Sequence, residues 1–279
     1  MTAYRHVALI GVGLLGGSIG SALRRGRLAE RVVGYGRKRE TLALAVQQGA
    51  CHQATTEFEA AVRGADVVIV CTPVQTVAKL ALAAEPLLAE GGFVTDVGSV
   101  KASIVAEVER SGGRRFVGSH PMAGSEKTGV EHSRADLFAN ALTFVTPTEK
   151  SDPALVQRTV EFWSRLGCRV KQVSPEAHDV CVAATSHVPH LIASVLAAST
   201  PEDVLDCVAG GWKDSTRVAA GDVEMWRQIV CENRAAAVAG LDRFLAAADS
   251  MRRSLASGDD DVWVRILEEG KRRRDAVGS

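Results

Sequence analysis

Near its N-terminus the chain reads Val7-Ala8-Leu9-Ile10-Gly11-Val12-Gly13-Leu14-Leu15-Gly16. The first four residues form an apolar run typical of a buried parallel strand, and the next six match the pattern GxGxxG. A helix-like stretch follows from about residue 17 to residue 25. Glycine turns between a strand and a helix bind the pyrophosphate of a dinucleotide, because the helix N-terminus offers free N–H groups and a positive dipole end. The sequence therefore predicts a Rossmann-type dinucleotide-binding domain.

Each position of this turn has a predicted role. Gly11 permits the tight turn, Gly13 lets the backbone approach a pyrophosphate, and Gly16 lets the helix pack closely on the strand. Leu14 and Leu15 complete the predicted cofactor-binding set at the start of the helix. A glycine-rich turn that holds no ligand is the alternative.

We predict the second strand at 31–35, and the residues that follow it bear on the choice between NAD and NADP. An acidic residue normally stands there and binds the ribose 2′-hydroxyl of NAD, but this chain has Gly36, followed by Arg37 and Lys38. No carboxylate is present to repel a 2′-phosphate, and a guanidinium pairs well with phosphate. We therefore predict that NADP is favoured, with these three residues in its site. The alternative is that the cations are solvated and that NAD is bound without an acidic contact.

Helical and apolar strand-like segments continue to alternate up to residue 173. We predict strands at 66–71, 93–97, 115–117, 143–147 and 169–173, and helices at 40–48, 75–89 and 153–166. This alternation predicts an α/β fold with a parallel sheet, whose ligands bind beyond the carboxyl ends of the strands. The loops at Thr72-Pro73 and at 98–101 should therefore line the nicotinamide crevice. We place the domain boundary after Ser174, which gives domains 1–174 and 175–279.

Two polar residues follow the strand at 93–97. Ser99 is a candidate hydrogen-bond donor to a ligand, and capping of the helix that begins near Ala102 is the alternative. Lys101 could bind an anion, but a lysine at a helix start is usually solvated, which is what we expect here.

The run 118–126 reads Gly-Ser-His-Pro-Met-Ala-Gly-Ser-Glu and should be a loop leaving the end of the strand at 115–117. It combines an imidazole with small residues, the hydroxyl of Ser125 and the carboxylate of Glu126. Histidine is the side chain best able to take a proton near neutral pH, so His120 is the candidate general base. An incidental histidine in a surface turn is the alternative.

From Glu176 onward the sequence is alanine-rich and helix-periodic, which predicts an all-α domain of about one hundred residues. His178, His187 and His190 lie at its start, and the last two share a helix face. With no HExxH pattern and no cysteine partner, we expect no metal there, and core histidines bound to the backbone are the alternative.

The rest of the helical region suggests a carboxylate clamp and a dimer. Arg217 could bind a carboxylate bidentately, although an isolated arginine is more often a surface residue. Asp222 should cap one long helix from Val223 to about Ser257. A helix of that length with an apolar stripe often packs against a partner chain, so we predict a homodimer.

Composition narrows the class of protein. The 279 residues carry 33 basic and 33 acidic side chains, so no overall basic field favours nucleic acid. The six cysteines are scattered without a CxxC pair, which suits a reducing compartment. The N-terminus lacks a signal-peptide core, and no uninterrupted apolar run is long enough to span a bilayer. We expect a cytoplasmic protein without membrane or nucleic-acid partners.

Six motifs resemble, in their order, those of the prephenate and arogenate dehydrogenases of tyrosine biosynthesis. They lie at 11–16, 96–101, 118–126, 178–179, 186–190 and 213–217, and the resemblance covers nearly the whole chain. It implies oxidative decarboxylation of prephenate to 4-hydroxyphenylpyruvate with hydride transfer to NAD(P)⁺. The alternatives are arogenate as the substrate, or both compounds, and a catalytically silent nucleotide-sensing protein.

The resemblance also implies roles for single residues. His120 would polarise and deprotonate the ring hydroxyl, and Ser99 would hydrogen-bond both that hydroxyl and His120. Arg217 would bind a substrate carboxylate, and Glu126 would act as a gate residue. The implied substrate-binding set is completed by Ser125, Ser186, His187, His190 and Lys213. The chain departs from the family pattern at Gly36, where the usual acid is missing.

Overall fold

The first part of the chain forms a parallel sheet of five strands in the order β3-β2-β1-β4-β5. The strands are β1 (Tyr4–Ile10), β2 (Ala29–Tyr35), β3 (Gln53–Thr55), β4 (Val67–Val70) and β5 (Phe93–Asp96). β4 is buried along its whole length and β1 nearly so, as expected for apolar runs covered on both faces. This computed structural model describes residues 3–124 and 127–278. The strand order reverses between β1 and β4, which is where open α/β sheets bind ligands.

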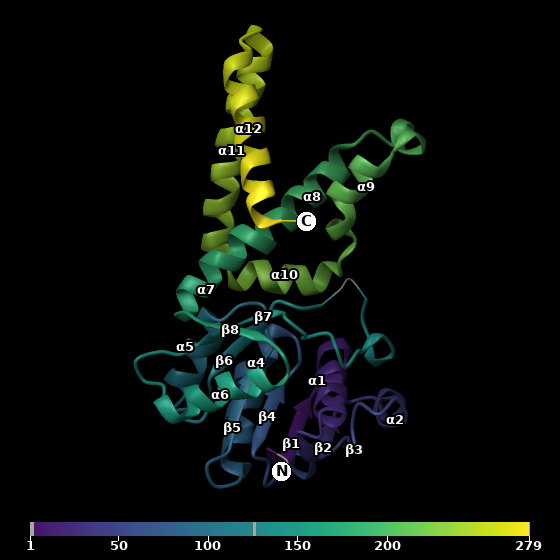
Figure 1. Cartoon of the computed structure of the whole chain (residues 1–279), viewed down its shortest axis with the longest axis vertical. Helices are drawn as coiled ribbons and strands as arrows, with labels where there is room; N and C mark the ends of the chain where they lie inside the picture. The colour runs from purple at the N-terminus through teal and green to yellow at the C-terminus, as the bar shows by residue number, and fades with distance from the viewer. Residues whose placement is uncertain (1–2, 125–126, 279) are drawn as a thin grey trace.

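Helices cover both faces of the sheet (Figure 1). They are α1 (Leu14–Arg25), α2 (Arg39–Gln47), α3 (Phe58–Val62), α4 (Val74–Ala84), a 3-10 turn η1 (Glu85–Leu87) and α5 (Ala102–Arg110). Successive residues of β1 enter opposite cores: Val7 and Leu9 pack with α1, whereas Ala8 and Ile10 pack with α4 and α5. This alternation follows from the two-residue period of a strand.

A second sheet continues from the edge of the first. It contains β6 (Gly118–Pro121), β7 (Leu142–Thr146) and β8 (Arg169–Gln172), with β6 and β7 antiparallel and β7 and β8 parallel. The 3-10 turn η2 (Val130–His132) and helix α6 (Pro153–Arg165) complete this part. The predicted strand at 115–117 is wrong, because Phe116 makes only a single bridge to Val94 before the chain turns to pair with β7. His120 therefore lies within a strand and not in a loop.

The second part of the chain consists of helices and short connections, with no strand among its described residues. It comprises α7 (Pro175–Val182), the π-type turn η3 (Ala183–His187), α8 (Val188–Ser199), η4 (Glu202–Cys207), α9 (Gly210–Thr216), η5 (Arg217–Ala220), α10 (Val223–Glu232), α11 (Arg234–Ser257) and α12 (Asp260–Val277). In Figure 1, α11 and α12 project away from the sheets as a hairpin, α8 and α9 form a second arm, and α7 and α10 lie next to the first part. The predicted fold, a Rossmann-type domain followed by an all-α domain, is confirmed. The boundary after Ser174 stays a prediction; β8 ends at Gln172 and α7 begins at Pro175.

The single long helix predicted from 223 to 257 is wrong. The cap is confirmed, since the Asp222 side chain accepts a hydrogen bond from Met225 N at 2.7 Å. The helix, however, breaks at Asn233, whose backbone has φ −121° and ψ 33°. The Asn233 side chain is buried and donates to the carbonyl oxygen of Asp179 at 2.7 Å. A tertiary contact thus separates α10 from α11.

One helical stretch, Pro175–Ser199, is long and apolar enough to cross a membrane when judged by length and composition alone. It carries His178, Asp179, His187 and His190, all buried, and Asp179 hydrogen-bonds to the backbone of α5. These contacts join the stretch to the first part of the protein, so we assign it to the contact between the two parts.

Candidate active site

The glycine turn between β1 and α1 has the shape of a phosphate cradle. Gly11 has φ +98°, and a Cβ there would lie 2.7 Å from the carbonyl oxygen of Cys71. A Cβ at Gly16 would collide with the carbonyl oxygen of Gly11. By contrast, a Cβ at Gly13 would meet open space. The turn is thus packed against β4 on one side and accessible on the other.

The N-terminus of α1 is free to bind an anion. Gly13 is its N-cap; the structure gives the helix no side-chain cap, and there is no acidic residue in the first turn. Among the described residues, no N-cap side chain accepts a hydrogen bond from the N–H groups of this first turn, around Leu14 and Leu15. These groups therefore need another acceptor. The open cradle and the uncapped helix together fit the pyrophosphate of a dinucleotide.

The other predicted cofactor residues lie at the same edge of the sheet. The Gly11 N–H donates to the carbonyl oxygen of Tyr35 at 2.9 Å, so Gly36 leaves β2 beside the cradle. Arg37 and Lys38, which follow, are exposed. After β4, the Thr72 hydroxyl accepts from the Thr76 hydroxyl at 2.8 Å, and Pro73 begins the turn into α4. The structure thus brings these residues together without showing what they bind.

Asp96, at the end of β5, is the centre of a buried polar network. Its Oδ1 accepts from Ser119 N at 3.0 Å, and its Oδ2 accepts from Gly98 N at 2.8 Å. Oδ2 also forms an ion pair with Lys101 Nζ, and both side chains are fully buried. Burial lowers the pKa of Lys101, whereas Asp96 acts in the opposite direction. The prediction that Lys101 is solvated is wrong, because the lysine turns inward to pair with this carboxylate.

Strand β6 is anchored through Ser119. The Ser119 hydroxyl accepts from Trp163 Nε1 at 2.8 Å and donates to the Asp96 carbonyl oxygen at 2.7 Å. Successive residues of a strand point to opposite faces, so an inward Ser119 places His120 on the other face. That face is turned toward α7.

His120 is linked to two residues of the helical part. Its Nδ1 lies 2.9 Å from His178 Nε2, and His178 Nδ1 lies 2.7 Å from Asp179 Oδ1. Burial, with a smaller effect from His178 and Lys101, holds the pKa of His120 well below 6.5. Burial also lowers the pKa of His178, although its bond to Asp179 opposes this. His120 is therefore a neutral imidazole at pH 7, the form that can accept a proton.

Asp179 also caps α5. Its Oδ1 accepts from Lys101 N at 2.8 Å and its Oδ2 accepts from Ala102 N at 2.9 Å. A carboxylate is favourable at a helix N-terminus because it satisfies free N–H groups and faces the positive dipole end. The cap that Ser99 was considered for is thus supplied by Asp179. Ser99 is partly exposed in the same loop, and its bond to His120 stays a prediction.

A second group of predicted residues lines the helical side. The rings of His190 and Trp226 are stacked, with centroids 3.6 Å apart and an angle of 12°. The His187 ring meets the same tryptophan edge-on at 6.1 Å, and its Nδ1 lies 3.3 Å from Asn233 Nδ2. Burial lowers the pKa of His190 and brings that of His187 to about 4. Ser186 lies beside them in η3, partly exposed.

The remaining candidates are less closely placed. Arg217 begins η5 and is exposed, and so is Lys213 on α9. Gly221 directly follows η5, and a Cβ there would lie 3.3 Å from the His190 ring, so the turn that begins at Arg217 ends next to the stacked pair. Ser125 and Glu126 lie outside the described residues.

Comparison with known proteins agrees with this arrangement. Residues 19–172 match the family model described as prephenate dehydrogenase, nucleotide-binding domain. Residues 174–269 match the model described as prephenate dehydrogenase, dimerization domain. The chain belongs to the prephenate dehydrogenase family. The predicted family and the oxidoreductase class are thereby confirmed.

Among curated members of the prephenate dehydrogenase family, the cyclohexadienyl dehydrogenase of Zymomonas mobilis is 31% identical over 99% of this chain and 97% of its own length. The prephenate dehydrogenase of Bacillus subtilis is 32% identical over 97% of this chain and 76% of its own length. The solved prephenate dehydrogenase of Aquifex aeolicus, in complex with hydroxyphenyl propionate and NAD⁺, is 33% identical with a TM-score of 0.90, and the match covers 98% of each chain. The arogenate dehydrogenase of Synechocystis is 26% identical with a TM-score of 0.82, covering 98% of this chain and 99% of its own.

In this family member, sequence reasoning missed the ion pair and the contact of His178 with His120. Asp96 and Lys101 lie five residues apart in the run Asp-Val-Gly-Ser-Val-Lys, and an acid at the end of an otherwise apolar strand was the available signal. The pairing of His120 with His178 joins residues 58 positions apart. No periodicity or spacing could have revealed it.

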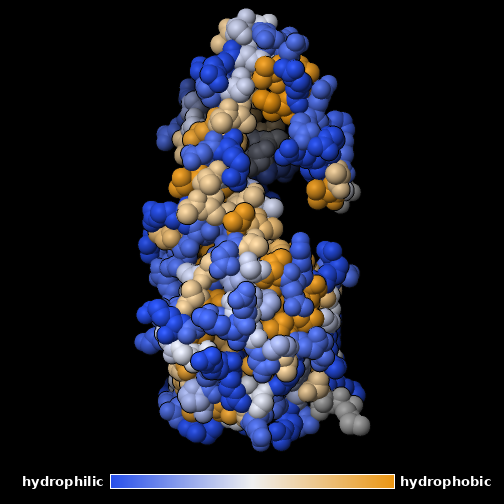
Figure 2. Space-filling view, turned by 90° about the vertical axis from the view of Figure 1, so that its left-hand side faces the viewer, coloured by the Kyte–Doolittle hydropathy of each residue, from blue (hydrophilic) through white to orange (hydrophobic). Residues whose placement is uncertain are grey.

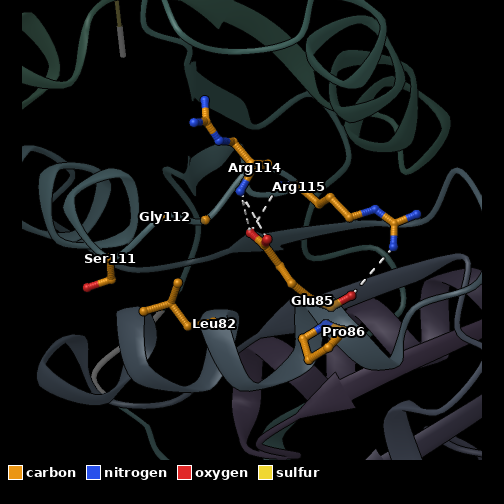
Figure 3. Close-up of a pocket in the computed structure, with 8 residues that line it drawn as sticks. Leu82, Glu85, Pro86, Ser111, Gly112, Arg114 and Arg115 are labelled. Atoms are coloured by element: carbon orange, nitrogen blue, oxygen red, sulfur yellow. Dashed lines mark hydrogen bonds between the residues drawn. The ribbon is translucent and has the colours of Figure 1, made fainter.

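A surface pocket of about 540 Å³ is lined by none of the candidate site residues (Figure 3). It is next to the end of α5, whereas the histidine network is at the beginning of that helix. Figure 3 shows that the Glu85 carboxylate reaches across it; the carboxylate accepts from the backbone N–H groups of Arg114 and Arg115 at 3.0–3.1 Å. The Glu85 carboxylate thus stabilises the loop at 114–115, and we assign this pocket no part in the chemistry.

Proposed function

We propose that the chain oxidises prephenate with NAD(P)⁺ and releases CO₂, giving 4-hydroxyphenylpyruvate. The observation that carries the proposal is the placement of His120. It is a neutral imidazole on β6, the strand of the second sheet that lies next to β5, and it is linked to the helical part through His178. The match to the family over both of its domains supports the same activity.

In the proposed reaction, the chain's own residues orient the substrate and move one proton. With the pyrophosphate of the dinucleotide in the turn at Gly11–Gly16, its nicotinamide would supply the acceptor for a hydride from the ring carbon that bears the hydroxyl. His120 takes the hydroxyl proton as that hydride leaves, and returns it to the oxygen as the ring carboxylate departs as CO₂. No net proton is consumed, and the ring becomes aromatic. Ser99 donates a hydrogen bond that orients the hydroxyl.

The substrate carboxylates are assigned to the helical side. Arg217 binds one of them, since a guanidinium matches a carboxylate with two parallel hydrogen bonds. The wall made by His190 and Trp226 supports this placement, because η5 leads from Arg217 to that stacked pair. We keep the other predicted contacts of the substrate as part of the proposal: Ser125, Glu126, Ser186, His187 and Lys213.

For the cofactor, we propose NADP as the favoured nucleotide. Gly36 offers no carboxylate against a 2′-phosphate, and the exposed Arg37 and Lys38 are the cations beside the cradle. NAD is the alternative, supported by the solved relative that holds NAD⁺ at 33% identity.

We propose a cytoplasmic homodimer. All the large, exposed hydrophobic side chains of the described residues except Val46 lie in the helical part; they include Val195, Leu205, Phe244 and Leu245. Figure 2 shows apolar side chains on the surface of this projecting part. Contiguous exposed apolar surface marks sites of association, and the matched dimerization domain supports the same partner. Sedimentation should give twice the chain mass at micromolar concentration, and a monomer there would refute the dimer.

Arogenate is the second candidate substrate. Two relatives support it, the one named cyclohexadienyl dehydrogenase and the one named arogenate dehydrogenase. Arogenate carries an amine on its side chain where prephenate carries a keto group. The rings of the two compounds are the same, so the same oxidative decarboxylation applies to both.

The test of the proposal is a steady-state comparison of four pairs, NAD⁺ or NADP⁺ with prephenate or arogenate. The absorbance of the reduced nicotinamide reports turnover. We expect the highest kcat/KM with NADP⁺ and prephenate. A nucleotide that binds without any turnover by the four pairs would instead favour a silent nucleotide-sensing protein.

A further inference from the structure

We propose that His178 and Asp179 are positioning residues that hold His120 in one tautomer, with its proton on Nδ1 and its accepting lone pair on Nε2. The inference deepens the proposed function and rests on it for the role of His120. It concerns the protonation of one ring, however, and that can be observed whether or not prephenate is turned over.

The geometry forms a chain of three side chains. Asp179 Oδ1 lies 2.7 Å from His178 Nδ1, and His178 Nε2 lies 2.9 Å from His120 Nδ1. The His178 ring is fully buried, and the Asp179 side chain is 7% exposed. Water is thus largely excluded from the His178 ring and from Asp179. The hydrogen-bond donors and acceptors of these three side chains must therefore satisfy one another.

The Asp179 carboxylate is the fixed end of the chain. It accepts from two backbone N–H groups at the start of α5, those of Lys101 and Ala102. Its own carbonyl oxygen accepts from the buried Asn233 side chain at 2.7 Å. These three bonds hold the residue from two directions. An ionised carboxylate can only accept hydrogen bonds, so His178 must present N–H at Nδ1.

The tautomer of His120 follows from this constraint. Burial lowers the pKa of both rings, so each is neutral near pH 7 and carries one proton. With the His178 proton on Nδ1, its Nε2 presents a lone pair, and His120 must donate from Nδ1. The opposite tautomer of His120 would set two lone pairs against each other at 2.9 Å. The free lone pair of His120 is therefore on Nε2.

Packing holds the two rings at the angle that this bond needs. Phe144 is the register partner of His120 on β7, and its ring meets His178 edge-on with centroids 5.2 Å apart. The planes of His120 and His178 are inclined at 68°. Lys101, which is close enough to affect both rings, is held by its ion pair with Asp96. Its positive charge disfavours protonation of either histidine.

The expected effect on the reaction is large. In the serine proteases, the aspartate of the triad likewise fixes the tautomer of the catalytic histidine, and losing that tautomer lowers kcat by about 10,000-fold. Here an imidazole is interposed between carboxylate and base. The structure assigns to His178 the transfer of the orienting effect of Asp179 to His120.

The direct test is ¹⁵N NMR of the wild-type protein labelled at its histidines, at pH 7. The nitrogen shifts show which ring nitrogen is protonated, and the His120→Asn variant identifies the signals of residue 120. We expect the proton of His120 on Nδ1 with Nε2 bare, and the proton of His178 on Nδ1. A proton on Nε2 of His120 would overturn the proposal, whatever the enzyme's substrate.

Two variants test the consequence for turnover. His178→Phe keeps an aromatic ring of similar size but removes the acceptor, whereas His178→Gln keeps an oxygen acceptor close to the position of Nε2. We expect His178→Phe to lose about 100-fold or more in kcat while KM for prephenate stays within about threefold. His178→Gln should retain kcat within about tenfold of the wild type. His132→Gln, at an exposed histidine of η2, is the matched control and should be unchanged.

Wild-type kcat in His178→Phe, or an equal loss in the Phe and Gln variants, would contradict the acceptor role. A wild-type protein with the expected tautomer but no turnover of prephenate or arogenate would refute the proposed function and leave the tautomer assignment standing.

Discussion

The buried ion pair of Asp96 and Lys101 shows how single residues build this site. Removing two charges from water costs several kcal/mol per ion, and the cost is offset only when the remaining hydrogen-bonding groups are satisfied. Here the carboxylate also accepts from the backbone of Gly98 and Ser119. The pair therefore fixes the end of β5 and, through Ser119, the strand that carries His120.

At the residue scale, Arg217 can be tested through substrate binding. If it binds a substrate carboxylate, Arg217→Ala removes a charge-assisted hydrogen bond worth about 1.5–3 kcal/mol. We expect KM for prephenate to rise at least about tenfold with a smaller change in kcat. Arg63→Ala, at an exposed arginine of the first part that pairs with Glu59, is the control. A normal KM in Arg217→Ala would remove the arginine from the substrate site.

The choice of nucleotide is also a residue-scale question. Arg37→Ala removes the cation best suited to a 2′-phosphate, and it is exposed, so the fold should tolerate the change. We expect kcat/KM for NADP⁺ to fall about tenfold or more while that for NAD⁺ stays within about twofold. Steady-state assays with both nucleotides measure this, and NAD⁺ serves as the internal control. An equal loss for both nucleotides would refute a specific contact with the 2′-phosphate.

At the scale of elements, α7 connects the two parts of the molecule. Asp179 caps α5 of the first part, and its carbonyl oxygen receives the side chain of Asn233 at the junction of α10 and α11. Asp179 thus makes both contacts: its side chain caps α5, and its carbonyl oxygen binds the asparagine at which the predicted long helix breaks. The helices that line the candidate site are held by these polar contacts as well as by apolar packing of α10 on α4.

Asn233 should contribute measurably to stability. Asn233→Leu preserves the size of the side chain but leaves the buried carbonyl oxygen of Asp179 without this donor. We expect the free energy of unfolding to fall by about 1–3 kcal/mol in urea titrations at constant protein concentration. Gln228→Leu, on the preceding helix, loses only a bond to Glu224 in an exposed pair and should change stability by less than about 0.5 kcal/mol. If both variants lose the same amount, the buried bond has no special weight.

Elements that contain an apolar run or a helical periodicity could be predicted from the sequence, among them the four-residue strands β4 and β5, whereas the shortest elements could not. The run from Val7 to Gly16 gave the strand, turn and helix in the right order, because local pattern and fold agree there, although α1 begins at Leu14 and not near residue 17. β3 has three residues and α3 five, too few to show any periodicity. The strand that holds His120 contains glycine and proline, so its pairing with β7 depends on tertiary structure.

The candidate site was predictable as residue types and not as contacts. His120 stood out because a histidine between small residues at a sheet edge suits proton transfer. Its partner could not be identified, since the bond to His178 links β6 with α7 across the domain contact. Lys101 was misjudged for the same reason, because a lysine at a helix start appears solvated until its carboxylate is known.

At the scale of the whole molecule, the histidines buried between the two parts make stability depend on pH. Burial brings the pKa of His187 to about 4, below the value of about 6.5 in the unfolded chain. The unfolded chain therefore binds more protons, and stability is lost as the pH falls through 6.5 toward 4. Between pH 7 and pH 5, His187 alone should lower the free energy of unfolding by about 2 kcal/mol.

Urea titrations of the wild type and His187→Gln at pH 7 and pH 5 check this expectation. The variant lacks the titrating ring, so its loss of stability on acidification should be smaller by about 2 kcal/mol. Other titrating groups are common to both proteins and cancel in the difference. Identical losses would mean that the His187 ring is not held neutral by burial.

The central claim is that His120 is the base in a nicotinamide-dependent oxidation of prephenate. The most direct measurement is the absorbance of the reduced nicotinamide when wild type or His120→Asn is mixed with NADP⁺ and prephenate, together with the Kd of NADP⁺ for each. We predict turnover by the wild type, a kcat about 100-fold to 10,000-fold lower for the variant, and equal nucleotide affinity. An unchanged kcat in His120→Asn would contradict the claim.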